Sequence, residues 1–181
     1  MISCVYFSLI CEVKGAGRVI EAARMLPQVS FHFYGRIEHG YEDAFRLAMR
    51  SLPNVEYHGV FDSVSNDVIV ELGQYDLHLL PSAWASEGVP GVLVETKIAA
   101  VPSIVSDVCY NAEIIKNGVD GVVLRENTAE CLIAAIEMLD ADPTLLSHMK
   151  ASALASAEHY YVDQYIDEIV ADLETELTRG L

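Results

Sequence analysis

Short apolar runs alternate with segments of helical periodicity along most of the chain. The apolar runs, rich in β-branched and aromatic residues, predict strands at residues 3–11, 29–34, 55–58, 76–80, 103–105 and 121–124. Strands that alternate with helices are typical of repeated βαβ units, in which the strands run parallel. The pattern therefore predicts an α/β fold, a doubly wound parallel sheet of about six strands with helices on both faces.

Two intervening segments have one apolar face and end at a proline. The first is ended by Pro27 and the second by Pro53, and their apolar positions are Val19, Ile20, Ala23 and Leu26, then Tyr41, Phe45, Ala48, Met49 and Leu52. After the last strand, Asn127 with Glu130 three residues later is similar to a capping box. Asp142 before Pro143 predicts a second helix start, so extra C-terminal helices run to about residue 157.

The end of the chain carries an amphipathic pattern with many carboxylates. Its apolar positions are Val162, Tyr165, Ile166, Ile169, Val170, Leu173 and Leu177. We therefore expect a domain over residues 1–160 and a terminal acidic helix over residues 161–181 that packs on the same domain.

Composition narrows the classes of partner. The chain has 181 residues, 52% of them hydrophobic, and a net charge of −16. One domain of this size can bury a core, and its acidity argues against binding to nucleic acid or to an anionic membrane surface. Membrane contact is expected to be at most peripheral and to occur through a domain absent from these residues. The four cysteines show no spacing typical of a metal site, so we expect reduced core thiols, a cytoplasmic location and no metal.

The first candidate motif is glycine-rich. Gly15 and Gly17 follow the first predicted strand, and Arg36 stands where a dinucleotide fold can hold a 2′-phosphate. However, Ile20 replaces the third glycine of that fingerprint, and three residues separate the strand from Gly15. We interpret both glycines as turn and helix-entry residues, and an NADP-dependent oxidoreductase remains the third functional alternative.

The second candidate motif follows the predicted strand at residues 76–80. A helix that begins near Pro90 places free backbone N–H groups at the carboxyl end of a parallel sheet, where they favour an anion. Glu87 and Glu95 lie on either side of this helix start, and a carboxylate can accept two hydrogen bonds from a vicinal diol. Diol, diphosphate and diol together describe a nucleotide sugar.

These residues carry a family resemblance. Glu87 and Glu95, in the sequence EGVPGVLVE, resemble the E-x7-E donor signature of GT-B glycosyltransferases of group 1 (family 4). Further matches extend the resemblance over nearly the whole chain, at Lys14-Gly15, Phe33 to Gly35, Asn54 to Gly59, Tyr75-Asp76, Ala100 to Ser106, Asn111 to Ile114 and Asn117 to Gly121. In that family the C-terminal half is a Rossmann-like domain that binds the donor sugar.

The resemblance implies roles for individual residues. Glu87 would contact hydroxyls of the donor sugar and Glu95 the ribose diol, with Glu87 and Lys14 as the catalytic candidates. Lys14 and the amides of Gly91 and Val92 would hold the diphosphate. Gly88 belongs to the same donor-binding motif, and the loops after Gly35 and Gly59 would flank the base. The family also has an arginine before the lysine, where this chain has Ser8 or Leu9.

The resemblance implies a retaining hexosyltransferase that uses a UDP-, GDP- or ADP-sugar as substrate, needs no cofactor and acts on a saccharide or lipid-linked acceptor. In the family an N-terminal domain binds the acceptor, and such a domain is absent from these residues. The isolated chain is therefore expected to bind nucleotide sugar with little transfer. The alternative is a non-catalytic or split nucleotide-sugar-binding module that needs a partner N-terminal half.

Overall fold

The protein is described by a computed structural model over residues 2–86 and 88–179. Its centre is a six-stranded parallel sheet in the order β3-β2-β1-β4-β5-β6. The strands are β1 (Ser3–Phe7), β2 (Ser30–Tyr34), β3 (Val55–Gly59), β4 (Leu77–Leu80), β5 (Ser103–Ser106) and β6 (Gly121–Leu124). The doubly wound parallel sheet predicted from the apolar runs is confirmed, as is the Rossmann-like fold that the resemblance implies.

The first strand is shorter than expected. It ends at Phe7, whereas the apolar run continues to Cys11. Ile10 and Cys11 are fully buried, yet Ile10 forms only an isolated bridge to Ile37. Burial alone makes a segment apolar, so the pattern could not separate a buried loop from a strand.

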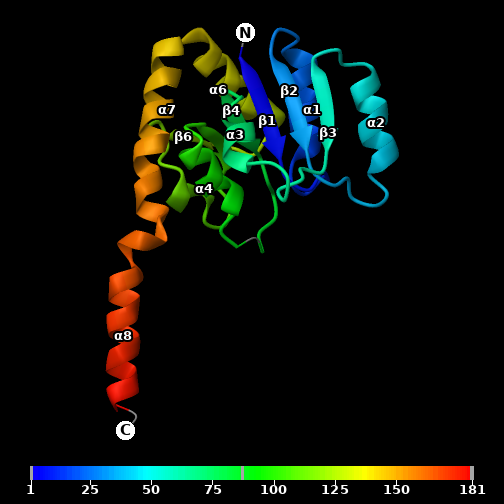
Figure 1. The fold of residues 1–181 in the computed structure, drawn as a ribbon. Helices are drawn as coiled ribbons and strands as arrows, with labels where there is room; N and C mark the ends of the chain where they lie inside the picture. Colours follow the sequence, from blue (N-terminus) through cyan, green and yellow to red (C-terminus); the bar gives the residue numbers. More distant parts are fainter. Residues whose placement is uncertain (1, 87, 180–181) are drawn as a thin grey trace.

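Helices cover both faces of the sheet, as predicted (Figure 1). Successive side chains of a strand point to opposite faces. In β2, Phe31 and Phe33 belong to the core cluster with α1 (Ala16–Met25), α2 (Glu42–Arg50) and α6 (Ala129–Ala141). Tyr34 lies in a second cluster with α3 (Val68–Leu72) and α4 (Gly91–Ile98). A short helix, α5 (Asn111–Ile114), follows β5.

The helices after β6 begin at capping residues. Asp142 accepts hydrogen bonds from the N–H groups of Thr144 and Leu145 at the start of α7 (Pro143–Ala157), which confirms the predicted cap before Pro143. At the start of α6 the cap is Thr128, whose hydroxyl accepts from Cys131 N–H, and the prediction of Asn127 was wrong. The Asn127 side chain instead donates to Ser82 O at 2.8 Å, because the loop after β4 lies beside it.

The chain after α7 extends away from the sheet. Two short 3-10 turns, η1 (Glu158–Tyr160) and η2 (Val162–Gln164), precede α8 (Ile166–Arg179), which projects from the body of the molecule in Figure 1. Its apolar side chains Ile166, Ile169, Val170 and Leu173 are exposed instead of packed on the domain as expected. An amphipathic stripe requires some apolar partner, but the domain surface does not supply it here. The division at residue 160 stays a prediction.

The four cysteines differ in burial. Cys4 and Cys11 are buried free thiols, as predicted, and Cys131 is half-buried. Cys109 was wrongly placed in the core: it is exposed in the loop after β5, where its Sγ donates to Ala85 O. Among the described helices, none combines the length and the apolar character needed to cross a bilayer.

Candidate functional site

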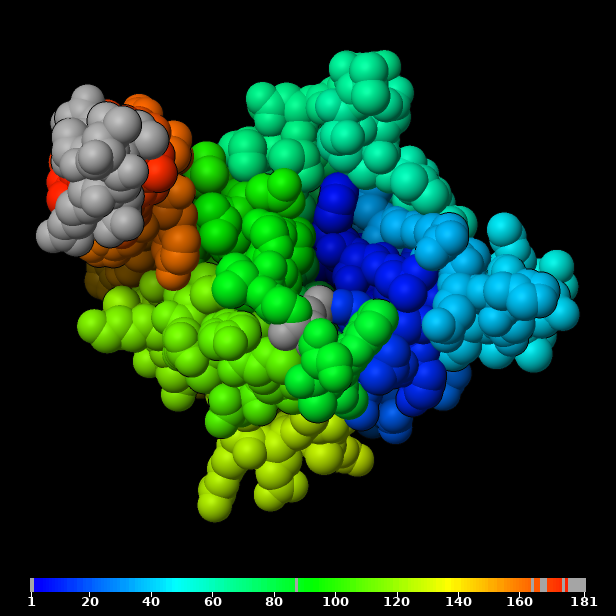
Figure 2. Space-filling model, turned by 90° about the horizontal axis from the view of Figure 1, so that it is seen from below, coloured from blue at the N-terminus to red at the C-terminus, as the bar shows by residue number. Residues whose placement is uncertain are grey.

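The predicted site residues that the structure describes lie at or near the carboxyl ends of the strands. In the sheet order, β2 lies on one side of β1 and β4 on the other, so the chain connections diverge between β1 and β4. Ligands of open α/β sheets bind in the crevice at such a switch point. Figure 2 views this end of the molecule and shows the segment after β1 beside the segment between β4 and α4.

Two loops are joined at this point. The Ala83 N–H donates to Val13 O at 2.7 Å, which links the loop after β4 to the loop after β1. Gly15 has φ +83°, and a Cβ built there would lie 2.1 Å from Pro81 O. Only glycine fits this left-handed, close-packed position. Gly15 caps α1 and Gly17 lies in its first turn, which confirms their interpretation as turn and helix-entry residues.

A cavity of about 300 Å³ opens beside these loops. Its walls include the aromatic rings of Phe7, Tyr34 and Phe61; the rings of Phe7 and Tyr34 stack at 5.1 Å, and Phe61 meets Phe7 edge-on at 5.5 Å. The remaining lining residues are Ser8, Gly35, Val60, Ser63, Val68 and Glu95. The cavity thus combines an aromatic wall with one carboxylate, a composition that suits a flat ring attached to a hydroxylated group.

Glu95 supplies that carboxylate. It lies on α4 and is half-buried, and desolvation raises the pKa of its carboxyl group. A carboxylate in such a partly dry position gains more from hydrogen-bond donors than one in water does. Glu95 therefore lies where its carboxylate faces the cavity, and its predicted contact with a ribose diol stays a prediction.

The two glycines predicted near the base lie side by side. Gly35 N–H donates to Gly59 O at 2.8 Å, and Gly35 lines the cavity. Gly35 has φ +140°, and a Cβ there would lie 1.9 Å from Ser8 O. The absence of a side chain lets the end of β2 approach the loop after β1, which forms one border of the cavity.

In the described structure, Lys14 is not one of the residues that line this cavity, but it contacts the neighbouring loop after β4. Its side chain is 7% exposed, and its Nζ lies 4.7 Å from the centre of the Trp84 ring, a cation–π contact. Trp84 is itself 41% exposed, so it covers the lysine instead of entering the core. The contact holds a positive charge at the junction of the loops after β1 and β4.

Three further residues predicted to bind the nucleotide-sugar donor, Gly88, Gly91 and Val92, lie at or just before the start of α4. The helix begins near Pro90, as expected: Pro90 is the N-cap, and Gly91 and Val92 are the first two helical residues. The N–H groups of Gly91 and Val92, the first two helical positions, have no partner within the helix. The Leu93 N–H donates to Pro90 O at 3.0 Å, and Pro90 itself has no N–H. Gly91 and Gly88 are exposed and Val92 packs partly on the Tyr34 cluster. Glu87 lies outside the described residues, so its predicted role stays a prediction.

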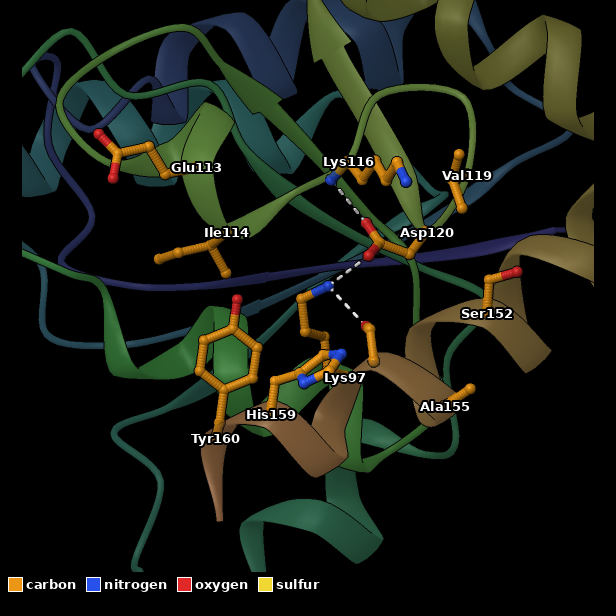
Figure 3. A pocket seen from close by; sticks show the side chains of 11 residues that line it. Lys97, Glu113, Ile114, Lys116, Val119, Asp120, Ser152, Ala155, His159 and Tyr160 are labelled. Carbon is orange, nitrogen blue, oxygen red and sulfur yellow. Dashed lines mark hydrogen bonds and ion pairs between the residues drawn. The ribbon is translucent and has the colours of Figure 1, made fainter. Parts of the chain in front are cut away.

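A second cavity, of about 450 Å³, lies between α4, α7 and the segment before β6 (Figure 3). The buried Lys97 Nζ lies 2.6 Å from Asp120 Oδ2 and donates to Ser156 Oγ at 2.8 Å. Asp120 Oδ1 also accepts from the Lys116 N–H at 2.8 Å. These groups satisfy one another's hydrogen-bonding capacity and join α7 to the domain. Among the described residues that line this cavity, none was predicted to bind the nucleotide sugar.

Sequence reasoning missed the aromatic wall. Phe7, Tyr34 and Phe61 were not selected, although Tyr34 directly precedes Gly35 and Phe61 follows Gly59 by two residues. The aromatic residues at or just after the ends of adjacent strands could have indicated this wall. However, aromatic side chains in strands are usually interpreted as part of the hydrophobic core. Of the histidines in strands, His78 is fully buried and His58 is exposed near the end of β3.

The chain was compared with known proteins. The family model described as glycosyl transferases group 1 matches residues 4–155. An exopolysaccharide phosphotransferase of Streptomyces coelicolor is 33% identical over 116 residues, which are 61% of this chain and 12% of that protein. A UDP-Gal:alpha-D-GlcNAc-diphosphoundecaprenol alpha-1,3-galactosyltransferase of Escherichia coli is 32% identical over 80 residues, which are 44% of this chain and 20% of that protein.

Solved structures share the fold. HepE of Anabaena, in complex with UDP and glucose, has a TM-score of 0.83 and 20% sequence identity. The alignment covers 96% of this chain and 48% of HepE. The chain thus spans about half of this structural relative and a fifth or less of the two curated relatives.

Proposed function

Since the chain belongs to the glycosyl transferases of group 1, we propose that it forms the donor-binding part of a retaining glycosyltransferase, with a nucleoside diphosphate sugar as its ligand. One observation carries the proposal: Glu95 lines an aromatic-walled cavity at the switch point of the sheet. The base lies against Tyr34 and Phe61, and the ribose hydroxyls donate to Glu95. The UDP in the HepE structure supports a uridine nucleotide as the first ligand to test.

The diphosphate lies between α4 and the loop after β1. The free N–H groups of Gly91 and Val92 and the helix dipole favour the negative phosphates. Lys14 adds one positive charge, which Trp84 keeps close to the junction of the two loops. These groups also stabilise the negative charge that develops on the departing nucleotide, so they contribute to transfer as well as to binding.

The donor sugar extends toward Gly88 and Glu87, where Glu87 accepts hydrogen bonds from sugar hydroxyls. Transfer to a saccharide or lipid-linked acceptor requires acceptor-binding residues, which a second domain supplies. The spans of 48% of HepE and 20% of the galactosyltransferase support a larger complete enzyme. By itself the 181-residue chain binds the nucleotide sugar and transfers little.

The test is nucleotide-sugar binding by the complete 181-residue chain. UDP-glucose, GDP-mannose and ADP-glucose are titrated by calorimetry and saturation-transfer NMR up to millimolar concentration. We expect saturable binding of at least one of them, weakened about tenfold or more by Glu95→Gln, because the hydrogen bonds to a charged acceptor are lost.

Glu137→Gln is the matched control, since Glu137 is an exposed helical glutamate on α6, away from the cavity lining. It should bind as tightly as the unmodified chain. Absence of binding by all three nucleotide sugars, or equal affinity in Glu95→Gln, would contradict the proposal.

A second candidate is a non-catalytic nucleotide-sugar-binding module. One observation favours it: the chain matches only 12% of the length of a protein named as a phosphotransferase. A segment similar to this chain therefore occurs within a protein whose name gives a different activity. Adding a separately expressed acceptor-binding half distinguishes the two: an enzyme gains transfer of sugar from the nucleotide, whereas a module binds the nucleotide with no transfer.

A further inference from the structure

Three potential metal ligands meet on the face of β2 and β3 that carries Tyr34. His32 Nδ1 lies 3.0 Å from His58 Nε2. Glu56 Oε2 lies 3.8 Å from His32 Nδ1, and Glu56 Oε1 lies 3.9 Å from His58 Nδ1. One ligand atom from each of the three residues falls within 4.8 Å of the other two. Because β3 is the edge strand, this group is reachable from solvent.

The strands themselves create this arrangement. His32 is the direct neighbour of Glu56 in the β2–β3 register, and the register shifts between Phe33 and Tyr34. Glu56 and His58 are two residues apart in β3, so they share a face. The backbone therefore holds all three residues close together without help from a flexible loop.

Aromatic contacts hold both imidazole rings in place. The Tyr34 ring stacks on His58 with centroids 4.5 Å apart and an interplanar angle of 8°, and the His32 ring lies 5.0 Å from Tyr75. The Tyr34 hydroxyl is hydrogen-bonded to Glu71 and lies 3.0 Å from the Tyr75 hydroxyl. Rings that are fixed in this way lose little freedom when they bind an ion.

The facing ring nitrogens have a chemical consequence. A neutral imidazole has one N–H and one lone pair, so two facing nitrogens can share at most one proton. A metal ion in place of that proton accepts both lone pairs. Nitrogen ligands at about 2.0–2.1 Å from a tetrahedral zinc ion lie about 3.4 Å apart, close to the 3.0 Å seen between these nitrogens.

We propose that His32, Glu56 and His58 form a binding site for a divalent transition-metal ion of the zinc class. Two imidazoles and one carboxylate are a common ligand set for such ions, and water completes the coordination at this exposed site. The Glu56 side chain is 66% exposed, so a rotation can bring its oxygen closer to the ion. The ion ties edge strand β3 to β2, and the proposal does not rest on the proposed nucleotide binding, although Tyr34 contacts both sites.

The experiment uses the complete chain, freed of metal with a chelator and dialysed. Zn²⁺ is titrated by calorimetry and Co²⁺ by visible absorption, and the melting temperature is followed with each ion. We expect one ion per chain, a tetrahedral or five-coordinate cobalt spectrum, and a melting temperature that rises to a plateau, because the ion binds the folded chain.

Two variants test the ligands. His58→Ala and Glu56→Gln should each weaken binding by more than about tenfold, since loss of even an outer-shell partner of a metal ligand costs that much. In chelator, Glu56→Gln should melt at the temperature of the unmodified chain, because the Glu56 side chain is 66% exposed. His58→Ala should melt lower, because it removes the ring that stacks on Tyr34, so its response to the ion is measured against its own metal-free melting temperature. Using both variants keeps the test valid if one of them folds poorly.

Two control variants exclude other ligands. His148→Ala changes an exposed histidine on α7, and Cys109→Ser removes the exposed thiol. Both should bind Zn²⁺ as the unmodified chain does. The proposal is overturned if the unmodified chain shows no saturable Zn²⁺ binding. It is also overturned if His58→Ala and Glu56→Gln bind Zn²⁺ as tightly as the unmodified chain does, or if Cys109→Ser no longer binds it.

Discussion

His78 should make the stability of the protein depend on pH. The side chain is fully buried in β4, and its Nδ1 lies 3.1 Å from Ser103 Oγ. Its Nε2 is buried without a hydrogen-bond partner in the described structure. Burial lowers the pKa of His78 from 6.5 to about 3, because a charged imidazolium would be stranded there.

The direction of the effect follows from proton linkage. Below about pH 6.5 the unfolded chain binds a proton at His78, whereas the folded chain does so only near pH 3. The stability contributed by neutral His78 is therefore complete above pH 6.5 and falls as the pH drops toward 3. Each pKa unit corresponds to about 1.4 kcal/mol, so His78 should cost about 2 kcal/mol at pH 5 relative to pH 7.5.

The assay is equilibrium urea unfolding at pH 7.5, 6 and 5, followed by circular dichroism. His78→Asn is the informative variant, since its amide can replace the contact to Ser103 but does not titrate. The advantage of the unmodified chain over His78→Asn should shrink by about 2 kcal/mol between pH 7.5 and pH 5. His148→Asn, at an exposed position, should leave the pH profile unchanged. Parallel loss of stability in His78→Asn and the unmodified chain would refute the reasoning.

Three further contacts can be tested by urea unfolding. Gly15→Ala should lower the free energy of unfolding by about 2–4 kcal/mol, because its φ of +83° is strained and the added Cβ meets Pro81 O at 2.1 Å. Gly118→Ala, at φ +75° in open space, should cost only about 1–2 kcal/mol, and equal losses would contradict the close approach. Lys97→Met should cost about 3–5 kcal/mol because it strands the buried Asp120 carboxylate, and adding Asp120→Asn should recover part of that loss; no recovery would argue against the ion pair. Asp142→Ala should cost about 1 kcal/mol by removing the α7 cap, whereas no change would show that the cap contributes little.

The sequence by itself determined the order of the elements. Side-chain periodicity is a local property, so the apolar runs placed all six strands and the helical stripes placed α1 and α2. The cap at Asp142 was also readable, because a proline directly after an acceptor side chain leaves little choice. Glu95, Gly35 and Gly59 were predicted as site residues from the family resemblance. The structure places Glu95 and Gly35 on one cavity, and Gly35 N–H donates to Gly59 O.

The sequence did not distinguish between two neighbouring residues that can each cap a helix. Asn127 and Thr128 are both good helix caps, and the neighbouring Ser82 carbonyl decided between them by binding the asparagine. Similarly, the apolar stripe of α8 indicates that an apolar partner is needed, but the stripe carries no information about which surface that is. A pattern along one helix cannot identify what packs against it.

Only the tertiary structure decided which distant residues meet. The aromatic wall, the Lys97–Asp120 pair and the His32, Glu56 and His58 group each join residues from separate elements. Their contacts depend on strand order, on register and on the angle at which a helix crosses the sheet. A shift of one residue in the β2–β3 register would separate His32 from Glu56, yet it would leave the apolar pattern of each strand unchanged.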